Sequence, residues 1–108
     1  MRKFKLIREE GFDSSIKGAI DYVIDTFRDT YAANGLIDNL DLAMQSIEDN
    51  PLSNPVIKVV DDYQVRRRNV PHSNYCILYT IRYGYIQLLD FVYSRRDIDA
   101  FLSRKLNR

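Results

Sequence analysis

The chain has 108 residues, a hydrophobic content of 45% and a formal net charge of +1. This length suits one domain with a modest core, and an aromatic content of 12% argues against a disordered chain. Its apolar runs are too short to span a membrane, and its start lacks the pattern of a signal peptide. The single cysteine excludes an internal disulfide. We therefore expect one domain over residues 1–108, in the reducing cytoplasm.

The charge is divided unevenly along the chain. Residues 1–50 carry six basic and ten acidic side chains, a balance of −4. Residues 51–108 carry ten basic and five acidic side chains, a balance of +5. A basic half of this kind is expected where a protein meets an anionic partner, and random variation in surface charge is the alternative.

The first elements in chain order are a strand and a helix. Residues 4–8 have the alternation of a short strand, which Gly11 is expected to end. Asp13 or Ser14 can then cap a helix through its side-chain oxygen. The apolar positions of that helix recur every three or four residues from Ile16 to Phe27, which is typical of an amphipathic helix.

A second helix is predicted after a break over residues 32–35, where Asn34 and Gly35 tolerate a left-handed backbone. Its apolar stripe runs over residues 36–47 and is closed by Asn50 and Pro51. Two helices joined this tightly should form an antiparallel hairpin.

Strands dominate the next part of the chain. Residues 56–60 are compatible with an extended segment, and residues 63–68 alternate as a strand does. A loop over residues 69–74 leads to a strand that begins at Tyr75 and places Ile77, Tyr79 and Ile81 toward the core. Tyr83 and Gly84 form a two-residue hairpin turn, and residues 85–93 are the return strand.

Residues 97–106 are predicted to form a short helix that Asp97 caps, with Ile98, Phe101 and Leu102 facing inward. The order of elements predicts an α+β fold. In this fold an N-terminal strand and an antiparallel helical hairpin pack on a twisted antiparallel sheet, followed by the short C-terminal helix.

The residue content argues against a conventional active site. One histidine and one cysteine, without carboxylates at ligand spacing, predict no metal, and no glycine-rich loop indicates a phosphate-binding cofactor. His72 fits a solvated loop residue better than a general base. Cys76, inside a strand, fits a buried small hydrophobe better than a nucleophile.

Two arginine clusters remain as candidates for binding a polyanion or an acidic partner. They are Arg66, Arg67 and Arg68 in one strand, and Arg95 and Arg96 after the last strand. The period of a strand places Arg66 and Arg68 on one face and directs Arg67 to the other, where its stem can pack against a helix. Guanidinium groups can also stabilise the charge that develops on a phosphodiester without a metal. A solvated basic face with no catalytic role is the alternative.

Several of these segments occur together in a known superfamily. They are the strand that ends Arg67-Arg68-Asn69, the strand over residues 75–81, and the closing run over residues 91–98. With the apolar stripes of residues 19–27 and 36–47, they make the chain from about residue 4 to residue 106 similar to the RelE/ParE toxins of bacterial type II toxin–antitoxin modules. The closing run is the most specific part of this likeness.

The resemblance implies a helical hairpin on an antiparallel sheet and a cognate antitoxin. A segment of that antitoxin would wrap the toxin through helix-in-groove or strand-addition contacts, giving a toxin–antitoxin hetero-oligomer. RelE-like members cleave mRNA in the ribosome without a metal or other cofactor. ParE-like members block DNA gyrase and need no catalytic set.

The nuclease set that the resemblance implies is incomplete in this chain. Arg66, Arg68 and Arg96 match its basic positions, and Tyr93 is a candidate for proton transfer. Cys76 stands where these nucleases have an arginine, and their late tyrosine is missing near Phe101 and Leu102.

The run from Tyr93 to Ile98 is closer to the ParE branch. We therefore expect a ParE-like toxin that arrests growth by poisoning gyrase. A RelE-like mRNA endonuclease and an inactive toxin-fold binding module are the alternatives.

Overall fold

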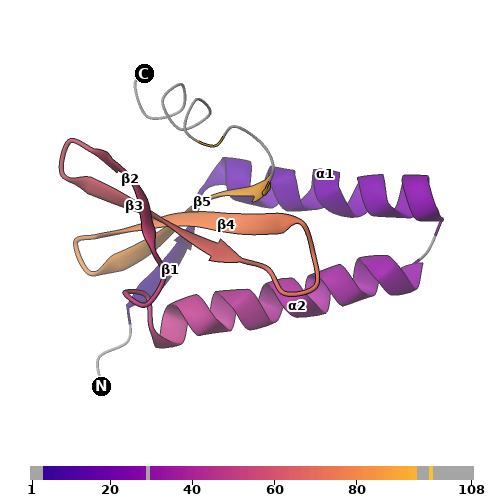
Figure 1. The fold of residues 1–108 in the computed structure, drawn as a ribbon, viewed down its shortest axis with the longest axis horizontal. Helices are drawn as coiled ribbons and strands as arrows, with labels where there is room; N and C mark the ends of the chain where they lie inside the picture. The colour runs from indigo at the N-terminus through magenta and orange to yellow at the C-terminus, as the bar shows by residue number, and fades with distance from the viewer. Residues whose placement is uncertain (1–3, 29, 95–97, 99–108) are drawn as a thin grey trace.

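A computed structural model describes residues 4–28, 30–94 and 98, and its architecture is the predicted α+β fold (Figure 1). Seven elements follow one another as strand, two helices and four strands. They are β1 (Lys5–Arg8), α1 (Glu10–Phe27), α2 (Thr30–Asp49), β2 (Val56–Val60), β3 (Tyr63–Asn69), β4 (Tyr75–Arg82) and β5 (Tyr85–Tyr93). Among the described residues, no helix is long and apolar enough to cross a membrane.

The strands form one sheet in the order β1-β5-β4-β3-β2. The four later strands are an antiparallel meander, as predicted, but β1 lies parallel to β5 with Lys5 opposite Tyr85. The predicted antiparallel sheet is therefore confirmed for the meander, and the parallel pair at this edge makes the five-stranded sheet mixed. The helical hairpin returns the chain to the end of the sheet where β1 stops, so β2 runs opposite to β1. The three reversals between β2 and β5 then make β5 parallel to β1.

The first helix begins earlier than the sequence predicted. The Glu9 N–H still donates to the Leu88 carbonyl of the sheet at 3.0 Å, and α1 starts at the next residue with no side-chain cap. Asp13 lies in the first turn, where its carboxylate pairs with the Arg8 guanidinium at 3.0 Å. Gly11 is inside the helix, so the predicted roles of Gly11 as strand end and of Asp13 or Ser14 as cap are wrong.

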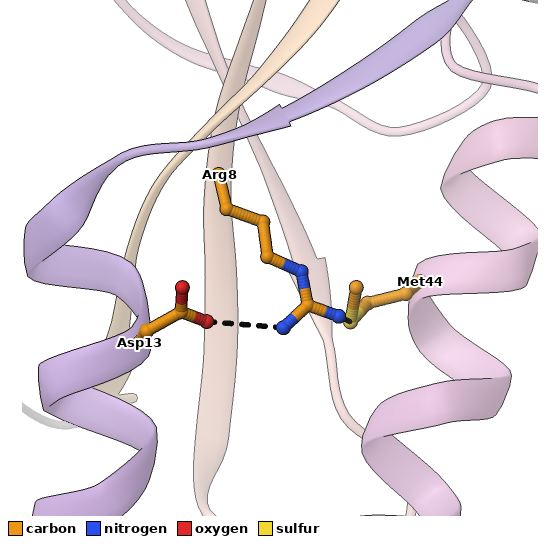
Figure 2. Close-up of polar contacts among 3 residues, drawn as sticks. All are labelled: Arg8, Asp13 and Met44. Carbon is orange, nitrogen blue, oxygen red and sulfur yellow. Dashed lines mark hydrogen bonds and ion pairs between the residues drawn. The ribbon is translucent and has the colours of Figure 1, made fainter.

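The Arg8 side chain lies between the two helices near the start of α1 (Figure 2). One terminal nitrogen donates to Asp13 of α1, and the other points to the Met44 sulfur of α2 at 3.9 Å. Its guanidinium also lies 5.9 Å from the centre of the Phe12 ring. This arginine therefore connects β1 with both helices of the hairpin.

The helical break is also displaced from its predicted place. Arg28 takes the left-handed conformation, with φ 49°, and its N–H closes α1 by donating to the Ile24 carbonyl at 2.7 Å. Residues 32–35 lie inside α2, where they extend the apolar stripe by one turn because Ala33 is buried with Leu36. The end of α2 at Asn50 and Pro51 agrees with the prediction.

The main core lies between the hairpin and one face of the sheet. The α1 helix packs on β5, and α2 contacts β3. Ile77 and Tyr79 are fully buried here and Ile81 packs against them, which confirms the predicted register of β4. The buried members are Phe12, Ala19, Leu36, Leu40, Ala43, Met44, Ile47, Val70, Ile77, Tyr79, Ile86, Leu88 and Phe91.

A smaller cluster covers the opposite face of the sheet. It contains Val65, Cys76, Leu78, Leu89, Val92 and Ile98. Ile98 is the one described residue of the predicted C-terminal helix, and it is buried as expected. Asp97, Phe101 and Leu102 lie outside the described residues.

Candidate functional site

The alternation of β3 separates the three arginines as the sequence predicted. Arg66 and Arg68 lie on the hairpin side, near the Tyr79 hydroxyl, whereas Arg67 lies near the Cys76 thiol on the other face. The helices α1 and α2 cover the face of the sheet on which Arg66 lies. The Arg67 side chain, on the other face, therefore does not pack its stem against either helix of the hairpin, contrary to the sequence prediction.

Arg66 is held by the loop that follows α2. Its Nη1 donates to the Asn54 carbonyl at 2.6 Å and to the Leu52 carbonyl at 3.1 Å, and its Nη2 donates to Gln64 Oε1 at 3.5 Å. Backbone carbonyls therefore occupy donors that an incoming phosphate would need. A guanidinium used in this way fixes the loop over residues 51–55 to the sheet.

Arg68 and Arg67 are used differently. The Nε of Arg68 is buried and has no hydrogen-bond partner among the described residues. A buried donor without an acceptor is costly, which makes Arg68 the arginine of β3 most suited to receive an anionic group. Arg67 donates from Nε to Asn69 Oδ1 at 2.9 Å.

Tyr93 is not brought together with these arginines by the sheet register. Arg68 is opposite Ile77 on β4, whereas Tyr93 is opposite Tyr75, further along β4 and two strands away from β3. Tyr93 instead packs edge-on against the Tyr75 ring, with centroids 5.8 Å apart. Arg95 and Arg96 lie outside the described residues, so the second arginine cluster is not placed.

An open groove of about 770 Å³, here called the tip groove, lies where the joined ends of α1 and α2 meet the loop between β3 and β4. Its helical wall is apolar and aromatic, and its loop wall is polar. It is lined by Tyr22, Val23, Phe27, Tyr31, Ala32, Gly35, Leu36, Asn39, His72, Ser73, Asn74, Tyr75 and Tyr93.

Aromatic side chains at this groove are unusually exposed. The exposed fraction is 83% for Tyr31, 65% for Phe27, 59% for Tyr22 and 42% for Tyr93. Tyr75 is the inner member, stacked on Phe91 at 4.8 Å between ring centres. Burial, together with the neighbouring Tyr22 and Tyr93 hydroxyls, raises the pKa of Tyr75.

The remaining reactive side chains agree with their predicted environments. Cys76 is fully buried, which confirms its prediction as a small hydrophobe. Burial raises the pKa of the Cys76 thiol, and the smaller opposing effects of Arg67 and Ser94 do not reverse this direction. His72 is exposed in the loop with φ 57°. Within the described part of the chain, no three histidine, cysteine or carboxylate side chains are grouped to hold a metal ion.

The tip groove was not predicted from the sequence. Phe27 was assigned to the buried stripe of the first helix, and Tyr31 falls beside the expected break. The signal that could have indicated it is the group of aromatic residues at the joined helix ends, Tyr22, Phe27 and Tyr31, which is more than a short hairpin turn can bury.

No protein-family model matches the chain, and comparison with curated proteins gives no match. Function is therefore inferred from the fold and from the arginines of β3.

Proposed function

We propose that the chain is the toxin of a type II toxin–antitoxin module of the RelE/ParE kind, and that it arrests growth by binding DNA gyrase. The order of strand, helical hairpin and antiparallel meander supports the proposal, because it agrees with the architecture that the sequence resemblance implies. A fold alone does not specify a function. The choice between the two toxin activities therefore depends on the side chains.

The observation that favours gyrase binding over mRNA cleavage is the set of hydrogen bonds that Arg66 already makes. Its Nη1 already donates to two backbone carbonyls, at 2.6 and 3.1 Å. A ribonuclease of this kind needs guanidinium groups that can stabilise charge developing on a phosphate. Cys76, at the position of another arginine of the nuclease set, is buried and is no cation. Tyr93 lies two strands away from Arg66. A toxin that acts by binding a protein needs none of these groups to converge.

Expression of the chain in a bacterial host tests the proposal. We expect growth arrest with loss of negative supercoiling in a reporter plasmid while bulk mRNA stays intact. Co-expression of the cognate antitoxin should restore growth. Growth arrest with early mRNA cleavage and unchanged plasmid topology would contradict the proposal, and an absence of growth arrest would favour an inactive binding module.

A ribosome-dependent endoribonuclease is the second candidate, because one observation favours it. Arg68 keeps a buried Nε without a partner in the described structure, and a phosphate oxygen could satisfy it. In that case Arg68→Ala and Arg96→Ala should abolish toxicity, and Tyr93→Phe should weaken it. Arg67→Ala, on the opposite face of β3, is the matched control and should remain toxic. Persistent toxicity of the Arg68 and Arg96 variants would exclude this candidate.

A further inference from the structure

The tip groove has the features of a surface that another molecule covers. Tyr31, Phe27 and Tyr22 are each more than half exposed, although they share one end of the hairpin. Monomeric proteins rarely expose a contiguous apolar surface of this kind without an interaction to explain it. Tyrosine and phenylalanine are also among the residues that contribute most where proteins associate.

The charge around the groove indicates the chemistry of the partner. Residues 10–28 and 30–49, which contain both helices, carry eight carboxylates and only two basic side chains, Lys17 and Arg28. Among the residues that the structure describes, the groove lining includes no lysine, arginine, aspartate or glutamate. An uncharged aromatic groove on an acidic hairpin attracts cations and repels phosphates.

One exposed carboxylate lies at the edge of the groove by helical spacing. Asp38 follows Gly35 by three positions and Tyr31 by seven on α2. Residues at these separations lie on the same side of a helix. A cationic side chain bound beside the groove therefore has an acidic partner on α2.

We propose that the tip groove binds a basic amphipathic segment of a partner protein. Apolar or aromatic side chains of the segment would enter the groove between Tyr22, Phe27 and Tyr31. Its lysine or arginine side chains would pair with Asp38 of α2. This is the helix-in-groove mode of recognition, and it stands independently of the activity proposed above. Single-stranded nucleic acid, which also stacks on tyrosine, is disfavoured because the described part of the lining offers no cation for the phosphates.

A pair of designed peptides tests this proposal with the full chain. One labelled helical peptide of about 18 residues has a leucine and tryptophan face with lysines on the other face, and the second has glutamate at every lysine position. Fluorescence anisotropy should show binding of the lysine peptide at least about tenfold tighter than that of the glutamate peptide. The Asp38→Asn variant should narrow the difference in affinity between the two peptides and reduce the dependence of that difference on salt.

Matched tyrosine variants distinguish peptide binding in the tip groove from nonspecific binding to any exposed tyrosine. Tyr31 and Tyr83 are both 83% exposed, but Tyr83 is in the β4–β5 turn and does not line the groove. Tyr31→Ser should weaken binding of the lysine peptide about tenfold or more, whereas Tyr83→Ser should leave it unchanged. Equal losses in both variants would overturn the proposal. So would equal binding of the two peptides, or an oligouridylate that binds and displaces the lysine peptide.

Discussion

The Tyr79 hydroxyl donates a hydrogen bond of 2.5 Å to the Pro51 carbonyl and accepts one of 3.0 Å from Asn54 Nδ2. Tyr79 is fully buried in the middle strand of the sheet, and Pro51 lies in the loop that follows the end of α2 at Asp49. Arg66 donates to the same loop from the neighbouring strand. The two side chains therefore fix the end of the hairpin to the sheet, which explains why Arg66 is a structural group in this fold.

Replacing Tyr79 by Phe should destabilise the protein. The change leaves the Pro51 carbonyl and the Asn54 amide without their buried partner, and the free energy of unfolding should fall by about 1–3 kcal/mol. Urea denaturation followed by circular dichroism measures the loss. Tyr83→Phe removes an exposed hydroxyl from the β4–β5 turn and should change stability little, so equal effects of the two variants would refute this role of Tyr79.

The protein should lose stability in alkaline solution through its buried acids. Burial raises the pKa of Cys76 above its ordinary 9.0 and that of Tyr79 above its ordinary 10.0. In both cases the unfolded chain releases its proton first. The contribution of each buried neutral group to the free energy of unfolding is therefore fully present below pH 9.0 for Cys76 and below pH 10.0 for Tyr79. It declines as the pH rises from there through the raised native pKa.

Thermal melts at a series of pH values from about 7 to about 11 measure this decline. The upper limit is about two pH units above the ordinary pKa of a thiol. Cys76→Ala should remove the loss of stability that begins near the ordinary pKa of a thiol. Tyr79→Phe should remove the loss of stability that begins near the ordinary pKa of tyrosine. A melting temperature that stays constant across the range would show that these groups titrate alike in the folded and unfolded chain.

Truncation of Ile77 should create a cavity in the main core. Ile77 is fully buried between the hairpin and the sheet, so Ile77→Ala should lower the free energy of unfolding by about 2–4 kcal/mol. Ile57→Ala on the exposed edge strand β2 is a control of the same chemistry and should cost much less. Chemical denaturation of the two variants compares them, and a similar loss in both would contradict the register of β4.

Replacing Arg28 by Gly should stabilise the hairpin. Arg28 is left-handed, with φ 49° and ψ 39°, a conformation that costs an L-residue energy and costs glycine almost none. The expected gain is about 0.5–1 kcal/mol, after allowance for the greater freedom of glycine in the unfolded chain. Arg28→Ala should give no such gain. If alanine stabilises the protein as much as glycine, the backbone conformation is not the cause.

Local periodicity was sufficient for most of the fold. The stripe of Leu36, Leu40 and Ile47 predicted the second helix, and the alternation of Ile77 and Tyr79 predicted the buried face of β4. The turn at Gly84, where φ is 80°, was also readable because glycine is suited to that conformation. These features depend on residues that are close in sequence.

Features that depend on distant residues were not readable in the same way. The parallel pairing of β1 with β5 joins Lys5 to Tyr85, and no local pattern specifies that partner. Alternation placed Arg66 on one face of its strand, but its acceptors are carbonyls twelve and fourteen residues away. The tip groove likewise combines four segments of the chain, so Phe27 was predicted as an ordinary core position.

Inhibition of purified DNA gyrase tests the central claim most directly. Relaxed plasmid, gyrase and ATP are incubated with increasing amounts of the folded chain, and supercoiled product is resolved on a gel. We expect supercoiling to fall as the protein is added, and an Arg68→Ala variant, which lacks the arginine best suited to bind phosphate, to inhibit equally well. Full supercoiling at a large molar excess of the protein, together with cleavage of mRNA on purified ribosomes, would contradict the account.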